Sequence, residues 1–158
     1  MSSRNELIRE VERTYAWVDK QLSDNAAAGI CGLCGKCCDF ESYGHKLFVT
    51  TPEILYFAEK IAGSPVIATP SLPRGKQSQT AISRCSFQVN HKCTVYPYRF
   101  AGCRIFSCKG RADFQSELTE KVIKKFKALC EKFQIPYRYI ELPTVLQDFT
   151  AEHAENAE

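Results

Sequence analysis

The chain has 158 residues, a formal net charge of +3 and a hydrophobic content of 44%. A chain of this length forms one well-filled core more readily than two, so we expect a single domain. The small positive charge does not by itself indicate a nucleic-acid or membrane partner. The first residues mix both signs of charge, and no stretch is apolar for long enough to cross a bilayer. We therefore expect a cytoplasmic protein without a membrane partner.

The first half of the chain contains two predicted helices with a cysteine-rich loop between them. Apolar residues recur at three- and four-residue intervals over 4–22, which predicts an amphipathic helix. A second helix is predicted to begin after Thr51, with Pro52 at its first position, and to end near Gly63. Residues 64–80 contain three prolines and no periodic pattern, which indicates a surface loop.

The second half combines short extended segments with one long helix. Extended segments are predicted over 81–89 and 93–98, joined by a turn. A stripe of large apolar residues predicts a helix over 114–133, and 137–142 has the composition of a short strand. Residues 151–158 are acidic and lack large apolar side chains, so we expect a disordered tail there.

Cysteine is the most informative residue type, with nine copies. Eight form a dense first group and a looser second group: Cys31, Cys34, Cys37 and Cys38, then Cys85, Cys93, Cys103 and Cys108. Cytosolic thiols are kept reduced, so a dense pattern there indicates metal binding or catalysis more often than structural disulfides. An odd number leaves one thiol unpaired in any intramolecular disulfide scheme, and bridging Cys37 to Cys38 would strain the peptide between them. Metal binding is therefore favoured.

The spacing in the first group is compatible with two kinds of metal. Cys31-x-x-Cys34-x-x-Cys37 is the spacing that directs three thiolates at one iron–sulfur cubane, with a fourth cysteine from elsewhere. A Cys-x-x-Cys pair is equally half of a tetrahedral zinc site. One mononuclear site would leave half of the eight cysteines unused, and the adjacent Cys38 suits a second metal or a polynuclear cluster. An iron–sulfur cluster of the 4Fe–4S type and zinc both stay open as the cofactor, with all eight cysteines as candidate ligands.

The segment 84–111 has no acidic residue and six basic ones. The basic residues are Arg84, Lys92, Arg99, Arg104, Lys109 and Arg111. Clustered thiolates carry negative charge, and nearby cations lower the cost of burying it. Arg99 and Arg104, each close to Cys103, are the best candidates for this supporting role.

Aromatic residues interleaved with these cations raise an alternative, in which they stack on the bases of a nucleic acid. The aromatic residues are Phe87, Tyr96, Tyr98, Phe100 and Phe106. Aromatic rings beside a metal site more often form the small core that shelters it. We therefore favour charge compensation over a nucleic-acid partner.

Two stretches carry a resemblance to a known family. They read Cys-x-x-Cys-x-x-Cys-Cys from Cys31 and Cys-x7-Cys-x2-Tyr-x2-Arg-x3-Cys-Arg-x-Phe from Cys85. With this pattern, residues 31–108 resemble the CxxCxxCC (YkgJ-like) family, whose members are described as zinc- or iron-chelating proteins. The chain departs from the family at Phe100, where the family usually has proline. The resemblance implies metal chelation by the cysteines and no particular reaction.

Three other residues are of types that often have a chemical role, but we expect a simpler structural role for each. Cys130 lies on the apolar stripe of the long helix, where we expect it to pack as a small hydrophobe. His91 is expected in an exposed turn, and Trp17 at the border of the first helix's apolar face. No nucleotide-binding loop, catalytic-triad pattern, His-Glu-x-x-His motif or carboxylate pair is present, so an enzyme is not indicated.

These features predict an α+β, mainly helical single domain over 1–150, with long loops organised around a cysteine-ligated metal site at 31–108. The predicted function is metal binding. With an iron–sulfur cluster, the protein would transfer electrons, sense redox state or deliver the cluster to a protein partner. The alternative is a structural-zinc module whose surface binds a protein or nucleic-acid partner.

Overall fold

The computed structural model describes residues 3–44, 46–62 and 84–155, which form one small, mainly helical α+β domain. The helices are α1 (Ser3–Ser23), α2 (Phe40–Tyr43), α3 (Thr51–Ala62), α4 (Ala101–Ile105), α5 (Ala112–Phe133) and α6 (Leu142–Glu155). The strands are β1 (Phe48–Thr50), β2 (Gln88–Val89), β3 (Lys92–Cys93) and β4 (Tyr139–Glu141). Short 3₁₀ turns occupy Ala26–Ala28, Lys36–Cys38 and Tyr96–Tyr98. The predicted fold class, a mainly helical α+β single domain, is confirmed.

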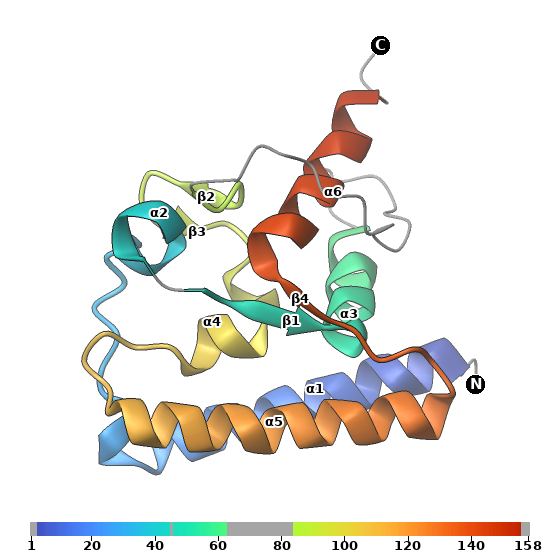
Figure 1. Cartoon of the computed structure of the whole chain (residues 1–158), viewed down its shortest axis with the longest axis horizontal. Coiled ribbons are helices and arrows are strands. Elements are labelled where there is room, and N and C mark those ends of the chain that lie inside the picture. The colour runs from blue at the N-terminus through green and yellow to red at the C-terminus, as the bar shows by residue number, and fades with distance from the viewer. Residues whose placement is uncertain (1–2, 45, 63–83, 156–158) are drawn as a thin grey trace.

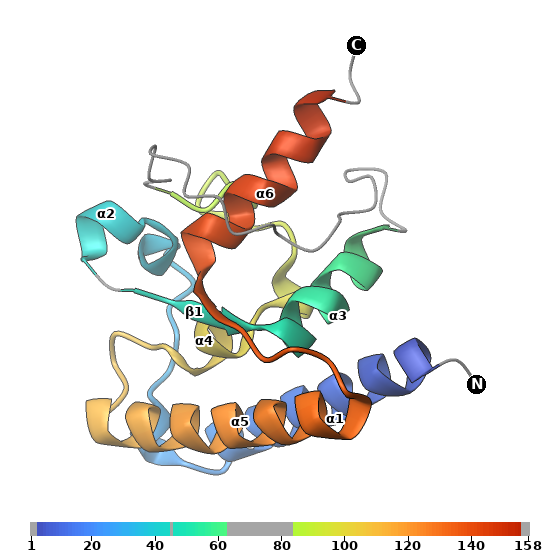
Figure 2. The ribbon, with the colours of Figure 1, turned by 45° about the vertical axis from the view of Figure 1, so that its right-hand side comes forward.

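The long helices α1 and α5 lie antiparallel, side by side along one edge of the molecule (Figures 1 and 2). Their predicted apolar stripes meet in one core, where Val11 and Val18 of α1 and Phe126 of α5 are fully buried. Both predicted helices are confirmed, and their observed ends lie within two residues of the predicted ones. No helix in the described part of the chain is long and apolar enough to span a bilayer.

A second core is built around the ring of Phe57 on α3. The centroid of this ring lies 5.2 Å from that of Phe87, 4.7 Å from Phe100 and 5.4 Å from Phe149. Aromatic contacts of this kind add to the burial of large apolar surfaces. The helix predicted to begin after Thr51 is confirmed as α3 and carries this ring. The second core therefore joins α3 to α6 and to the segment that carries the later cysteines.

A two-stranded sheet connects the two halves of the chain. β1 and β4 pair antiparallel, with Phe48 opposite Glu141. The strand predicted over 137–142 corresponds to β4, whereas neither β1 nor α6 was predicted. The tail expected from residue 151 begins inside α6, which continues to Glu155, and residues 156–158 lie outside the described part of the chain.

The region after α3 differs from its prediction in extent. The loop expected over 64–80 and the start of the first extended segment, 81–83, lie outside the described residues. The extended segments are confirmed only as the hairpin of β2 and β3, since Tyr96–Tyr98 forms a 3₁₀ turn. Asn90 and His91 have φ angles of 49° and 62°, the left-handed pair that a tight two-residue hairpin turn requires.

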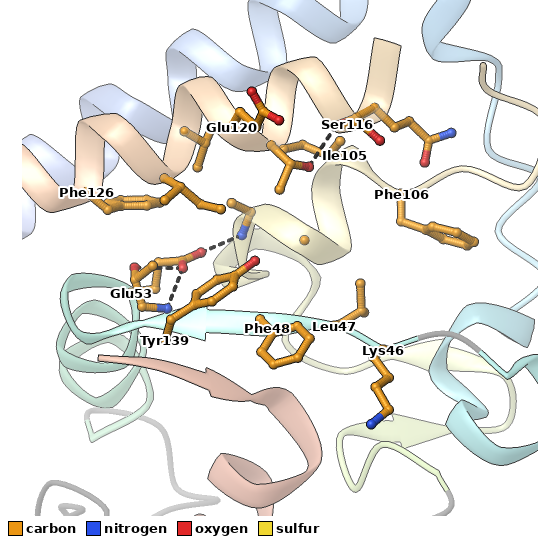
Figure 3. Close-up of a pocket in the computed structure, with 17 residues that line it drawn as sticks. Lys46, Leu47, Phe48, Glu53, Ile105, Phe106, Ser116, Glu120, Phe126 and Tyr139 are labelled. Carbon is orange, nitrogen blue, oxygen red and sulfur yellow. Dashed lines mark hydrogen bonds between the residues drawn. The ribbon is translucent and has the colours of Figure 1, made fainter. Parts of the chain in front are cut away.

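A buried carboxylate, Glu53, joins three elements of the fold. Its Oε2 accepts hydrogen bonds from the N–H and the hydroxyl of Thr50, both at 2.8 Å. Its Oε1 accepts from the N–H of Ala101 at 2.7 Å and from the hydroxyl of Tyr15 at 3.3 Å. Glu53 is one of the residues that line a cleft of about 350 Å³ between α4, α5 and the β1–β4 sheet (Figure 3). One side chain thus caps the beginnings of both α3 and α4 and holds α1 against them.

Replacing Glu53 with glutamine should lower the free energy of unfolding by about 2–4 kcal/mol, because an amide nitrogen would face donors that the carboxylate accepts, and each unsatisfied buried group costs about 1–3 kcal/mol. Urea unfolding followed by circular dichroism measures the change. Glu59→Gln is the matched control, since Glu59 lies on the exposed side of α3 in an ion pair with Arg4. Its effect should stay below about 0.5 kcal/mol. Equal losses in the two variants would contradict the linking role of Glu53.

The stabilisation that Glu53 provides should depend on pH. Burial raises the pKa of Glu53 above its ordinary value of 4.5, outweighing four hydrogen bonds that lower it. The folded state therefore binds this proton more tightly than the unfolded state does. The contribution of the group to stability is complete below pH 4.5 and is lost as the pH rises through the folded pKa. The difference in free energy of unfolding between wild type and Glu53→Gln should therefore become smaller above pH 4.5. Urea titrations at a series of pH values measure this difference. A difference that stays constant with pH would contradict the raised pKa of Glu53.

Candidate metal centre

The two cysteine groups meet at one pocket of about 330 Å³. Six of the eight candidate ligands line it: Cys31, Cys37, Cys38, Cys85, Cys93 and Cys103. We call the last five of these the inner thiols. The floor of the pocket is the aromatic core around Phe57, and Leu142 and Leu146 of α6 complete its wall. Side chains that are far apart in the sequence are thereby brought to one place.

A short backbone bridge joins the first cysteine group to the second. The N–H of Cys85 donates to the carbonyl oxygen of Cys38 at 2.8 Å. Beside it, the guanidinium of Arg84 pairs with the carboxylate of Asp39 at 3.0 Å. An exposed ion pair contributes little free energy, so the backbone bond and the packing beneath it hold the position. The result is that the Cys37–Cys38 pair lies next to Cys85.

A close approach at Gly35 fixes the first group against the β2–β3 hairpin. Gly35 has a φ of 72°, and a Cβ there would lie 2.6 Å from the carbonyl oxygen of His91 and against the amide of Gln88. The Gln88 amide donates to the Gly35 carbonyl at 2.6 Å. Only glycine combines this backbone conformation with such a contact. The hairpin, which carries Cys93, is thus held to the loop that carries Cys37.

Backbone N–H groups point at three of the sulfurs. The N–H of Leu33 donates to Sγ of Cys31 at 3.4 Å. The N–H groups of Phe87 and Gln88 lie against the thiol of Cys85, and that of Val95 lies against Cys93. In each case one donor comes from the residue two positions after the cysteine. Such donors favour the thiolate over the thiol, and thiolate is the form that binds metal.

Burial and mutual repulsion act against ionisation of the inner thiols. Burial raises the pKa of Cys85 to about 11 and that of Cys103 further above its ordinary value. A hydrogen bond from Cys38 lowers the pKa of Cys37, and the same bond raises the pKa of Cys38. The charge of Arg99 lowers the pKa of Cys93 and Cys103, but by less than burial raises it. Further positive charge among these sulfurs would favour their ionised form.

Only one of the two arginines predicted to support the site lies beside it. Arg99 lines the pocket and donates to the carbonyl oxygen of Cys103 at 3.4 Å. Arg104 faces the opposite way: its guanidinium lies 4.3 Å from the ring centroid of Tyr15 and pairs with Asp19 at 2.9 Å. Arg104 therefore does not neutralise the sulfurs directly, but it also donates to the carbonyl oxygen of Arg99 at 2.8 Å and so helps to position the arginine that lines the pocket.

The fold pairs half of the positive charges of segment 84–111 with carboxylates from outside this segment. Three of its six cations are paired with aspartates: Arg84 with Asp39, Arg104 with Asp19, and Arg111 with Asp113. Its aromatic rings are largely unavailable for stacking on bases as well. Phe87 and Phe100 are buried, and the exposed ring of Tyr96 is covered by the guanidinium of Arg99 at 3.5 Å. These contacts remove most of the basis for the aromatic nucleic-acid alternative.

Two candidate ligands lie outside the pocket. Cys34 and Cys108 are both exposed, and the side chain of Tyr43 is hydrogen-bonded to Cys108 and lies close enough to Cys34 for their charges to interact. Across residues 3–44, 46–62 and 84–155, no three cysteine, histidine, aspartate or glutamate side chains are placed to hold one metal ion together. The inner thiols therefore surround a common space without the geometry of a finished coordination site.

The residues expected to be bystanders behave as predicted. Cys130 is 3% exposed on α5 and is not among the residues that line the pocket. His91 is exposed in the hairpin turn at the edge of the pocket. Trp17 is partly buried at the border of the α1–α5 core. The sequence did not point to two residues of the site: Leu33, whose N–H donates to Cys31, and Gln88, whose amide donates to Gly35. Of these, only Leu33 could have been predicted, because it follows a cysteine by two residues.

Comparison with known proteins does not place the chain in a family. A search of protein-family models found no match, and neither did searches of the curated proteins and of the solved structures. The resemblance to the CxxCxxCC family therefore stays a prediction carried by the cysteine pattern.

Gly35→Ala should destabilise the protein by about 1–3 kcal/mol, because its methyl group would overlap the hairpin. It should also speed the alkylation of Cys37 and Cys38 by iodoacetamide, followed by peptide mass spectrometry. Gly44→Ala is the matched control, since Gly44 has a similar φ of 66° but nothing within 4 Å of the added carbon. The control should lose only the cost of left-handed backbone, about 1 kcal/mol, without faster alkylation. Matching alkylation rates would contradict the locking role of Gly35.

Proposed function

We propose that the protein binds metal through thiolates of its two cysteine groups, and that the metal group is an iron–sulfur cluster of the 4Fe–4S type. The observation that carries the proposal is the gathering of the inner thiols around one pocket, with N–H donors directed at the cysteines on its wall. Thiolate ligands select soft metal groups of this kind. When bound, such a cluster supplies reversible one-electron chemistry.

The size and lining of the pocket favour a polynuclear cluster over a single zinc ion. A structural zinc ion and a 4Fe–4S cluster each take four cysteine ligands, so the six cysteines on the wall suit either, and the size of the cavity separates the two. The volume of about 330 Å³ is roughly ten times the ~30 Å³ share of one water molecule in the liquid. The floor is apolar, which limits the access of water to the sulfurs and so contributes to the reduction potential.

The other residues of the pocket would support the bound group. Arg99 would offset part of the negative charge of the thiolates, and the N–H groups of Leu33, Phe87 and Val95 would donate to sulfur. Among the described residues that line the pocket, the groups beside the thiols that could act as a base or nucleophile are His91, Lys92 and Tyr96, and all three are exposed to solvent. Electron transfer, redox sensing or cluster delivery to a protein partner therefore fits better than catalysis, in line with the resemblance to the metal-chelating CxxCxxCC family.

Anaerobic purification followed by a visible spectrum and by iron, sulfide and zinc analysis tests the proposal. We expect a broad brown absorption with stoichiometric iron and sulfide. Colourless protein with stoichiometric zinc would replace the cluster by the alternative, a structural-zinc module whose surface binds a partner. Protein without either metal, whose thiols are oxidised in pairs, would overturn metal binding altogether.

Cys103→Ala should reduce the bound iron and sulfide several-fold, because Cys103 is an inner thiol on α4, which Glu53 caps. Cys130→Ala is the matched control, with the same atoms removed from a buried thiol that does not line the pocket. It should keep full metal content and lose only about 1 kcal/mol of stability. Metal analysis and urea unfolding of both variants separate the two effects. Equal metal content would exclude Cys103 as a ligand.

A further inference from the structure

Four cations around the pocket make no ion pair with a carboxylate in the described part of the chain. They are Lys36, Lys92, Arg99 and Lys109. Lys92 and Arg99 line the pocket, and Lys36 directly precedes Cys37. The ammonium of Lys109 lies 4.0 Å from the position that a Cβ would take on Gly32, so it stands over the loop of the first cysteine group. These four residues lie in or next to the loops that surround the opening of the pocket, which we call its mouth. The mouth therefore carries positive charge.

Exposed apolar side chains occupy the same loops. Among the described residues, six large apolar side chains are exposed, and four of them belong to the segments that carry cysteines. These four are Ile30, Leu33, Val89 and Tyr96, with exposed fractions of 85, 63, 54 and 42%. Leu33 and Tyr96 also line the pocket. Exposed apolar side chains near cations that make no ion pair are the composition of a protein-binding surface.

Leu33 is held outward at a conformational cost. Its φ of 52° is left-handed, which costs a residue with a Cβ about 1–2 kcal/mol. The N–H of Leu33 reaches the sulfur of Cys31 in this conformation, and glycine would make the same bond without the cost. The leucine side chain is thus not needed for the turn. Its presence at the mouth points to a contact outside the chain.

We propose that the mouth of the thiol pocket is the docking surface of an acidic protein partner, to which the cluster or its electrons pass. This inference rests on the proposed function. The unpaired cations set the sign of the partner's charge, and the exposed side chain of Leu33 in the pocket lining supplies apolar contact. A nucleic acid fits less well, because Arg99 covers the ring of Tyr96 while Phe87 and Phe100 are buried.

The test uses two fluorescently labelled peptides with the same leucine positions. In the acidic peptide the remaining positions are Asp and Glu, and in the neutral peptide they are Asn and Gln. Fluorescence anisotropy measures their binding to the metal-loaded, full-length protein at about 0.05 and 0.5 M salt. We expect the acidic peptide to bind about tenfold more tightly at low salt, with most of this advantage lost at high salt.

Three variants separate the parts of the surface. Exchanging Lys36, Lys92 and Lys109 together for glutamate should weaken the acidic peptide at least tenfold. The control exchanges Lys124, Lys125 and Lys127 on α5 for glutamate, with the same change in net charge, and should have less than about a twofold effect. Leu33→Gly keeps the left-handed turn and should weaken both peptides about tenfold, the value expected for one lost leucine contact.

Each contrary outcome overturns the inference in a recognisable way. Equal effects of the two triple exchanges would mean that net charge and not the mouth attracts the peptide. An oligothymidylate is the probe for a nucleic-acid partner. If it binds as tightly as the acidic peptide, and the exchange of Lys36, Lys92 and Lys109 abolishes this binding, the partner is a nucleic acid. Loss of metal from the purified wild type would defeat the proposed function, whereas metal-loaded protein that binds both peptides alike defeats only the docking surface.

Discussion

The carboxylate of Glu53 is the constraint on which the arrangement of the domain depends. It accepts hydrogen bonds from Tyr15 on α1, from Thr50 at the end of β1 and from Ala101 at the start of α4. The long α1–α5 pair, the sheet and the short helix α4 therefore meet at one buried side chain. Because Cys103 lies on α4, the position of an inner thiol is set by a carboxylate in the interior of the fold and not by the loops around the pocket.

The other inner thiols are positioned by backbone contacts between loops. The bond from Cys85 to Cys38 and the approach of Gly35 to the hairpin replace the helix packing that governs the rest of the domain. Loops with little core of their own draw stability from whatever they bind. The pocket combines this adaptable wall with a rigid aromatic floor around Phe57. Such a division suits a site whose thiols shift when a metal group enters while its floor stays in place.

Sequence reasoning succeeded where a periodic pattern was long and failed where a partner in space decides the outcome. The helices α1 and α5 were predictable because their apolar stripes repeat over several turns. Neither β1 nor α6 was, since a three-residue strand has almost no pattern and Pro143 obscures the start of a helix. The role of Arg104 depends on Asp19 and Tyr15, which no local pattern reveals. The cysteine motif gave eight candidate ligands, six of which meet at the pocket, but it did not reveal that Cys34 and Cys108 lie outside it.

The contribution of α6 to the pocket has a consequence for the life of the newly made chain. Leu142 and Leu146 complete the wall, yet every cysteine of the two groups leaves the ribosome before them. Until α6 is synthesised and docked, the six thiols of the pocket lack the part of the wall that α6 provides. Under the proposed function, insertion of the metal group follows translation, and the thiols must stay reduced until α6 has docked.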